Sequence, residues 1–169
     1  GQFMLTAEGV RVVEFNARFG DPEAMNTLPV LDTPFLDVLT AARDGDALPA
    51  LDFDARATVC KYAVPAGYPT DPEAGARIEV DEESVADAAA AGDGDALLFY
   101  ASVDAREDGL YTTTSRAFAV VGIAGTITDA EAIAEAALAA AGDGLRVRHD
   151  IGKPALVQRR IDHVASLRE

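Results

Sequence analysis

The chain has 169 residues, of which 29 are acidic and 14 basic, so its formal net charge is −15 at pH 7. This charge argues against nucleic acids and anionic membranes as partners, and no segment has the apolar length of a membrane span or the pattern of a signal peptide. A single cysteine excludes an internal disulfide and a cysteine-based metal cluster, and we expect a soluble, cytoplasmic protein with one domain and part of a second.

The composition is also unusual. Aspartate outnumbers glutamate, alanine is abundant, and arginine supplies almost all of the positive charge, since Lys61 and Lys153 are the only lysines. In this bias the chain is similar to proteins of halophilic archaea.

The N-terminal stretch predicts a β-hairpin. Residues 1–6 and 10–16 have strand patterns and flank a tight turn at 7–9. With a side-chain period of two, Glu14 and Asn16 emerge on one face of the second strand, roughly 6 to 7 Å apart. Because the pattern begins in the middle of a sheet, we expect the chain to be a fragment of a longer protein.

Glu14 and Asn16 are candidates for a metal site. A carboxylate and an amide oxygen at this spacing suit Mg²⁺, which prefers oxygen ligands and is shared between few protein groups and substrate phosphates. The alternative is a solvated strand face that binds nothing. Gly20 and Pro22 then break the strand into a loop, and such loops often carry function. The charged side chains of this loop are Arg18, Asp21 and Glu23.

A helix is predicted after this loop, followed by a domain boundary. Thr33 is a candidate N-cap, Pro34 a first helical residue, and Gly45 a helix end. Residues 44–54 are small, polar and turn-prone, which is typical of a linker. We therefore divide the chain into domains at residues 1–48 and 49–169.

The second part has the pattern of an antiparallel sheet with two helices. One helix is expected to be capped by Thr128 and stopped by Gly142 and Gly144, and another to begin at Pro154. Residues 82–94 fit either a surface helix or a loop. The predicted strands are 57–64, 77–80, 97–103, 110–113, 117–123 and 145–148.

Four single residues have simple structural interpretations. Cys60 is expected to be a buried small hydrophobe, and Lys61 to extend its ammonium group to the surface rather than to act in catalysis. His149 is expected to pack at a turn beside a capping Asp150, and His163 to lie on the surface.

Longer motifs link the chain to a known family. Residues 14–23 read E-F-N-A-R-F-G-D-P-E, and together with residues 24–31 they resemble the closing segment of the ATP-grasp domain of phosphoribosylamine–glycine ligases, also called glycinamide ribonucleotide synthetases. Residues 61–69, 114–117 and 148–152 match further landmarks of this family in the expected order. The resemblance implies an α+β fold. It consists of the end of an ATP-grasp domain, with antiparallel strands plus a helix, and a small β-rich C-terminal domain with two helices.

The resemblance also implies a reaction. The family joins glycine to 5-phospho-β-D-ribosylamine in the second step of purine synthesis. ATP phosphorylates the glycine carboxylate, and the ribosylamine nitrogen attacks the glycyl phosphate to give glycinamide ribonucleotide, ADP and phosphate. The implied cosubstrate is ATP and the implied metal is Mg²⁺ or Mn²⁺, bound by Glu14 and Asn16.

Further roles follow from the same resemblance. Arg18 would meet a phosphate or carboxylate, Asp21 would orient the attacking amine, and Asp21, Glu23 and Arg116 would bind substrate, with Arg116 at the ribose phosphate. Arg18 could instead pair with Asp21 or Glu23, and Arg116 could form a surface salt bridge. The glycine-rich loop, lysines and further carboxylate of the family's ATP site are expected upstream, so this fragment alone should be inactive. A noncatalytic lid or interaction module, and another ATP-grasp carboxylate–amine ligase, stay open as alternatives.

Overall fold

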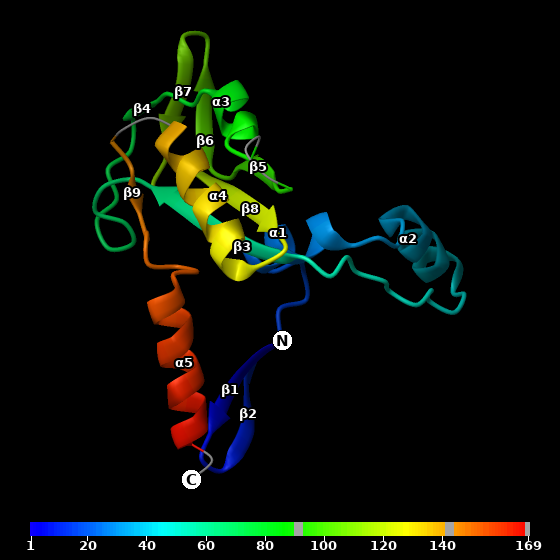
Figure 1. Cartoon of the computed structure of the whole chain (residues 1–169). Helices are drawn as coiled ribbons and strands as arrows, with labels where there is room; N and C mark the ends of the chain where they lie inside the picture. Colours follow the sequence, from blue (N-terminus) through cyan, green and yellow to red (C-terminus); the bar gives the residue numbers. More distant parts are fainter. Residues whose placement is uncertain (90–92, 141–143, 168–169) are drawn as a thin grey trace.

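The structure, a computed structural model, describes residues 1–89, 93–140 and 144–167 (Figure 1). It mixes helices with antiparallel strands, as predicted. The strands are β1 (Gln2–Thr6), β2 (Gly9–Glu14), β3 (Ala57–Val64), β4 (Arg77–Ile78), β5 (Asp95–Tyr100), β6 (Val103–Arg106), β7 (Gly109–Thr112), β8 (Phe118–Ala124) and β9 (Arg146–Val147). The helices are α1 (Glu23–Thr27), α2 (Phe35–Asp44), α3 (Glu82–Asp87), α4 (Ile127–Ala140) and α5 (Pro154–Ser166), with a 3-10 turn, η1, at Leu28–Val30.

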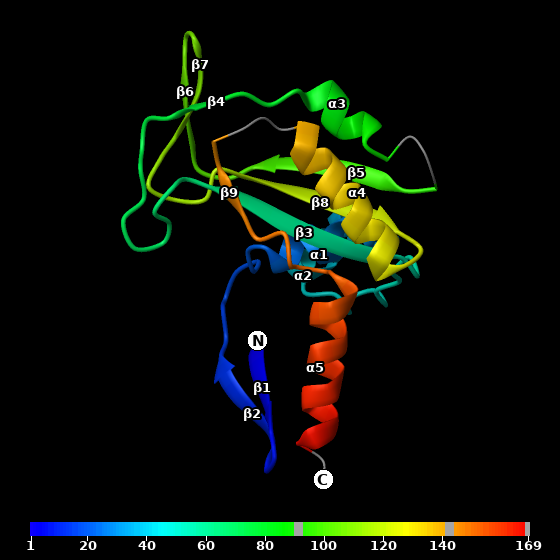
Figure 2. The same ribbon diagram turned by 60° about the vertical axis from the view of Figure 1, so that its left-hand side comes forward.

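The core is built around β8, one of the two inner strands of a four-stranded sheet in the order β5-β8-β3-β9. Its sequence, F-A-V-V-G-I-A, contains no polar side chain, and all of its residues are buried. A continuous apolar run is typical of a strand that is covered on both faces. Helix α4 crosses one face of the sheet, with α3 beside it, whereas α1 and η1 supply Met25 and Val30 to the other face (Figure 2).

A second, three-stranded sheet has the order β4-β7-β6. Strands β6 and β7 form an antiparallel hairpin, whereas the sequence pattern assigned no separate strand to Val103–Arg106. The predicted single antiparallel set is therefore two sheets. Residues 82–89 form α3 and the turn after it, with Val85 buried, and residues 90–92 of the predicted helix or loop lie outside the described residues.

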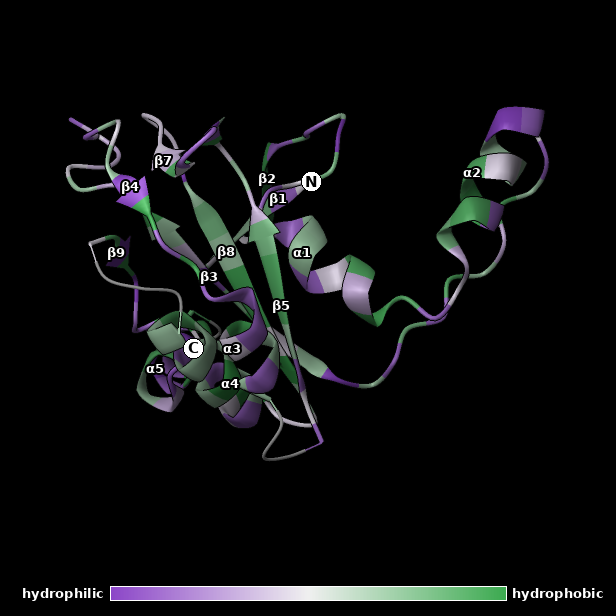
Figure 3. Ribbon diagram, turned by 90° about the horizontal axis from the view of Figure 1, so that it is seen from above, coloured by the Kyte–Doolittle hydropathy of each residue, from purple (hydrophilic) through white to green (hydrophobic). Residues whose placement is uncertain are grey.

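Three parts of the chain project from this core. The β1-β2 hairpin and α5 extend from the same side of the main sheet in both views (Figures 1 and 2), and α2 lies at the end of two extended segments (Figure 3). The hairpin exposes large apolar side chains, among them Phe3 (57%) and Val10 (65%), and α2 exposes Leu36 (72%). None of the helices within the described ranges is long and apolar enough to cross a membrane.

Both predicted threonine caps are wrong. The Thr33 hydroxyl donates to the carbonyl of Ala50 at 3.2 Å and accepts from the Asp52 N–H at 2.8 Å, so it holds the following segment rather than α2. At α4 the cap is Thr126, whose hydroxyl accepts from the Asp129 N–H at 3.1 Å, and Thr128 lies inside the helix.

The predicted helix ends are confirmed in part. Gly45 ends α2 in the left-handed region, with φ of 74°. Gly144 lies beyond α4 with φ of 98°, and Gly142 lies outside the described residues.

A candidate active-site loop and its contacts

The candidate metal ligands lie at the end of β2. Glu14 is the last residue of the strand, which ends before the predicted residue 16, and the Asn16 amide nitrogen donates to Glu14 Oε1 at 3.0 Å. The two side chains therefore project to the same side, as the period of two predicts, and Glu14 is exposed to solvent.

This pair fits a hard divalent cation in its donor chemistry. A carboxylate and an amide both offer oxygen, and Mg²⁺ commonly takes only one or two protein carboxylates. No group of three or more His, Cys, Asp or Glu side chains that could hold a metal occurs within residues 1–89, 93–140 and 144–167. Water and substrate phosphates commonly complete the coordination of Mg²⁺ at sites with few protein ligands.

The loop that follows separates its charged side chains. Arg18 donates to the carbonyl of its neighbour Phe19 at 3.4 Å, and among the described residues it forms no ion pair with Asp21 or Glu23. Glu23 begins α1 and folds back over Gly20, where an added Cβ would lie 2.5 Å from Glu23 Oε2. The alternative in which Arg18 pairs within the loop is therefore not observed.

Asp21 instead contacts the four-stranded sheet. The Tyr62 hydroxyl, on β3, donates to Asp21 Oδ1, and Arg116, just before β8, donates to Asp21 Oδ2 at 2.8 Å and to the Asp21 carbonyl at 3.3 Å. The Arg116 guanidinium also stacks over the Tyr62 ring, 4.5 Å from its centroid. Arg116 thus forms the salt bridge that was its alternative role, and that salt bridge is half-buried.

Tyr62 contacts the candidate loop, although the sequence pattern did not indicate it. Burial raises the pKa of its hydroxyl, and the hydrogen bond to Asp21 and the negative charge of that carboxylate raise it further, so it stays a donor at neutral pH. Tyr62 and Arg116 lie 41 and 95 positions along the chain from Asp21, and no local spacing signals that they meet there.

Tyr62 and Arg116 form part of the wall of a cavity of about 390 Å³. Pro22 brings the candidate loop to its rim, and the walls combine apolar side chains with further arginines and a second tyrosine. Besides Pro22, Tyr62 and Arg116, the lining residues are Cys60, Val64, Tyr68, Pro69, Arg146, Val147, Arg148 and Ile151. Apolar walls with a few polar groups are typical of small-molecule binding sites.

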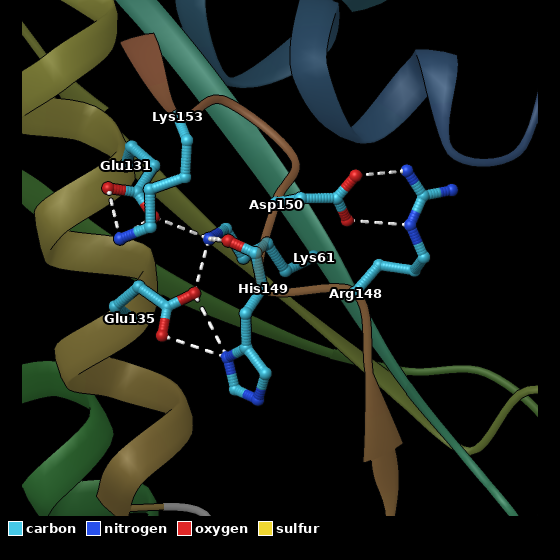
Figure 4. Close-up of polar contacts among 7 residues, drawn as sticks. All are labelled: Lys61, Glu131, Glu135, Arg148, His149, Asp150 and Lys153. Atoms are coloured by element: carbon cyan, nitrogen blue, oxygen red, sulfur yellow. Dashed lines mark hydrogen bonds and ion pairs between the residues drawn. The ribbon is translucent and has the colours of Figure 1, made fainter. Parts of the chain in front are cut away.

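A second polar cluster is structural and corrects the prediction for Lys61 (Figure 4). Lys61 does not reach the surface. It is fully buried, and its Nζ lies 2.6 Å from Glu131 Oε1 and also contacts Glu135 and the carbonyl of His149. The second lysine, Lys153, binds Glu131 as well, at 2.8 Å. A buried ammonium needs such compensation, because an unpaired buried charge is strongly destabilising.

The same cluster corrects the prediction for His149. Its side chain is 65% exposed rather than packed, and Nδ1 lies 2.9 Å from Glu135 Oε2. Asp150 caps no helix but accepts two hydrogen bonds from Arg148, which hold the pKa of its carboxyl down at about 2.

The predictions for Cys60 and His163 are confirmed. Cys60 is buried, and burial, with a smaller contribution from the charge of Asp21, raises the pKa of its thiol to about 11. His163 is exposed on α5.

Comparison with known proteins identifies the family. The family model of the phosphoribosylglycinamide synthetase C domain matches residues 58–154. The phosphoribosylamine–glycine ligase of Methanococcoides burtonii is 54% identical over 170 residues, covering 99% of this chain and 37% of the relative, and that of Methanosarcina barkeri is 52% identical with the same coverage. The chain thus spans about 37% of the length of these curated relatives.

A solved structure shares the fold. The crystal structure of phosphoribosylamine–glycine ligase from Thermotoga maritima superposes with a TM-score of 0.70 at 23% identity, over 88% of this chain and 35% of that one. With the family match above, the chain belongs to the phosphoribosylglycinamide synthetase C-domain family.

Proposed function

We propose that this chain is part of a phosphoribosylamine–glycine ligase of de novo purine biosynthesis, acting in the cytoplasm. The observation that carries the proposal is the 54% identity to such a ligase across 99% of the chain. Residues 1–48 would be the end of an ATP-grasp domain and residues 49–169 the C-terminal domain. The exposed apolar side chains of the β1-β2 hairpin and of α2 support this division, since an adjoining domain would cover them.

The reaction would join the carboxyl group of glycine to the amine of phosphoribosylamine at the expense of ATP. Glu14 and Asn16 would hold Mg²⁺ or Mn²⁺ at the end of β2, and their shared orientation supports this assignment. When bound, such an ion would neutralise charge that develops on the phosphate oxygens. Arg18, which makes only a carbonyl contact among the described residues, could direct its guanidinium at the phosphate or the glycine carboxylate.

The loop would supply the groups that hold the amine substrate. Asp21 accepts one hydrogen bond at each carboxylate oxygen from protein side chains, and each oxygen retains a lone pair. Asp21 could therefore also accept an N–H of the phosphoribosylamine and direct the nitrogen lone pair at the acyl carbon. Glu23, exposed at the start of α1, and Arg116, on the cavity wall, would contact the same substrate, with Arg116 at the ribose phosphate.

A chimeric enzyme tests the proposal. In the ligase of Methanococcoides burtonii, this chain would replace the matching segment, and phosphate release would be measured with ATP, glycine and phosphoribosylamine and with each one omitted. We expect release that requires all three. If the parent enzyme turns over and the folded chimera does not, the chain is a noncatalytic module. If the chimera accepts a different acid or amine, it is another carboxylate–amine ligase.

A further inference from the structure

The main sheet places two side chains on the candidate loop from outside it. Tyr62 and Arg116 lie on adjacent antiparallel segments, because Ala63 pairs with Phe118 and the Ala117 N–H donates to the Ala63 carbonyl at 3.0 Å. This register brings the phenol and the guanidinium together, with the guanidinium 4.5 Å from the ring centroid. Both side chains donate hydrogen bonds to Asp21, Tyr62 to Oδ1 and Arg116 to Oδ2.

The loop has further anchors to the same strand. The Thr58 hydroxyl of β3 donates to the carbonyl of Asn26 in α1 at 3.0 Å, and Met25 packs on the cluster around Cys60. The backbone on the C-terminal side of Asp21 is thereby held against β3. The orientation of the Asp21 carboxylate itself, however, depends on its side-chain donors.

We propose that Tyr62 is a positioning residue, which orients the Asp21 carboxylate toward the amine substrate by donating its hydroxyl to Oδ1. This inference rests on the proposed ligase function and adds a residue to it. Arg116 provides a positive charge beside the Asp21 carboxylate, and Tyr62 fixes the orientation of that carboxylate. With a donor on only one oxygen, the carboxylate could rotate about its Cβ–Cγ bond. Tyr62 touches no reacting atom in this assignment.

The chain offers a matched control for the missing hydroxyl. Tyr100, on β5, also donates its hydroxyl to a carboxylate, Glu82 Oε1, at 2.8 Å, and neither residue lines the cavity beside the loop. Tyr62→Phe and Tyr100→Phe therefore remove the same atom and the same kind of hydrogen bond, once at the candidate loop and once away from it.

The experiment compares these two variants in the chimeric ligase. For Tyr62→Phe we expect kcat/KM for phosphoribosylamine to fall on the order of tenfold, the usual effect of losing a hydrogen bond to a charged group, while the KM values for ATP and glycine change less than about twofold. Tyr100→Phe should leave all three substrates unaffected. Both variants should unfold at the temperature of the unmodified chimera to within a few degrees.

Each other outcome has a definite meaning. If Tyr62→Phe and Tyr100→Phe have the same kinetics, or if Tyr62→Phe lowers kcat/KM for all three substrates equally while lowering the unfolding temperature, Tyr62 has at most a structural role and the proposal is wrong. If the unmodified chimera folds but does not turn over, the proposed ligase function is wrong. That result differs from one in which the chimera turns over and only the role of Tyr62 is wrong.

Discussion

Lys61 of β3 and Glu131 of α4 lie 70 positions apart in the chain and form a buried ion pair, with Nζ 2.6 Å from Oε1. The pair joins the main sheet to the helix that covers it. Lys153 and His149 extend the network to the segment that leads into α5, so one buried ammonium organises three parts of the fold (Figure 4).

Removing that ammonium should be costly. Lys61→Met leaves the Glu131 carboxylate buried with one cation fewer, and we expect the free energy of unfolding to fall by about 3 to 5 kcal/mol. Urea denaturation of the chain would measure this loss. Lys153→Met, which removes a half-exposed ammonium from the same carboxylate, should have a smaller effect, and equal losses would contradict the central role of Lys61.

The same network predicts a dependence of stability on pH. Burial raises the pKa of Glu131, but the ammonium groups of Lys153 and Lys61 outweigh it and hold that pKa below its usual value of 4.5. A carboxyl with a lowered pKa in the folded state stabilises the protein above its unfolded pKa, and this contribution is lost as the pH falls through the folded pKa. The pKa of Glu135 is lowered in the same way, against burial, by Lys61 and His149.

We therefore expect the free energy of unfolding to decrease steeply below about pH 4.5. Glu135→Gln removes one of the two titrating groups. The free energy of unfolding of this variant should therefore decrease less between about pH 5 and pH 3 than that of the unmodified chain. Urea midpoints measured across this range would test the difference. Parallel curves for the two proteins would show that Glu135 does not contribute.

Gly122 should tolerate no side chain. A Cβ there would lie 2.0 Å from the carbonyl oxygen of Ala130 and 2.8 Å from the nitrogen of Ala134, so α4 packs directly on the backbone of β8. We expect Gly122→Ala to destabilise the protein by about 1 to 3 kcal/mol, since the helix must move away. Gly125→Ala is the control, because a Cβ at that position meets nothing within 4 Å. Thermal unfolding of both variants would measure the two losses of stability, and equal losses would contradict the close packing at Gly122.

Glu14 should matter for metal-dependent turnover. In the chimeric ligase, Glu14→Gln replaces a charged oxygen ligand with a neutral one, and we expect activity at limiting Mg²⁺ to fall by about tenfold or more, with partial recovery at high Mg²⁺. Glu8→Gln changes an exposed carboxylate on the same hairpin, whose one ion pair within the described part of the chain is with Arg11, and it should have no effect. An unchanged Mg²⁺ dependence in Glu14→Gln would remove Glu14 from the metal site.

Local sequence patterns predicted several elements closely. The run at 57–64 forms β3 with the predicted bounds, Pro154 begins α5, and Gly45 ends α2. These features depend on neighbouring residues, namely side-chain period, the restricted φ of proline and the freedom of glycine, so they can be read without the fold. The shared orientation of Glu14 and Asn16 has the same local origin.

Other features depended on which segments meet in space. The burial of Lys61 could not be predicted because its carboxylate partners lie on α4. The predicted cap at Thr33 is wrong because its hydrogen-bond partners lie 17 and 19 positions later in the chain. The contact of Tyr62 with Asp21 has no local signal because the two residues lie in different parts of the chain. The sequence by itself determined the elements, the family motifs and the face that Glu14 and Asn16 share. Only the tertiary structure decided that apolar side chains pack against both faces of β8. The same holds for the meeting of Tyr62 and Arg116 at Asp21. The physical reason is that periodicity acts between near neighbours, whereas burial and charge pairing depend on contacts that form only when distant segments fold together.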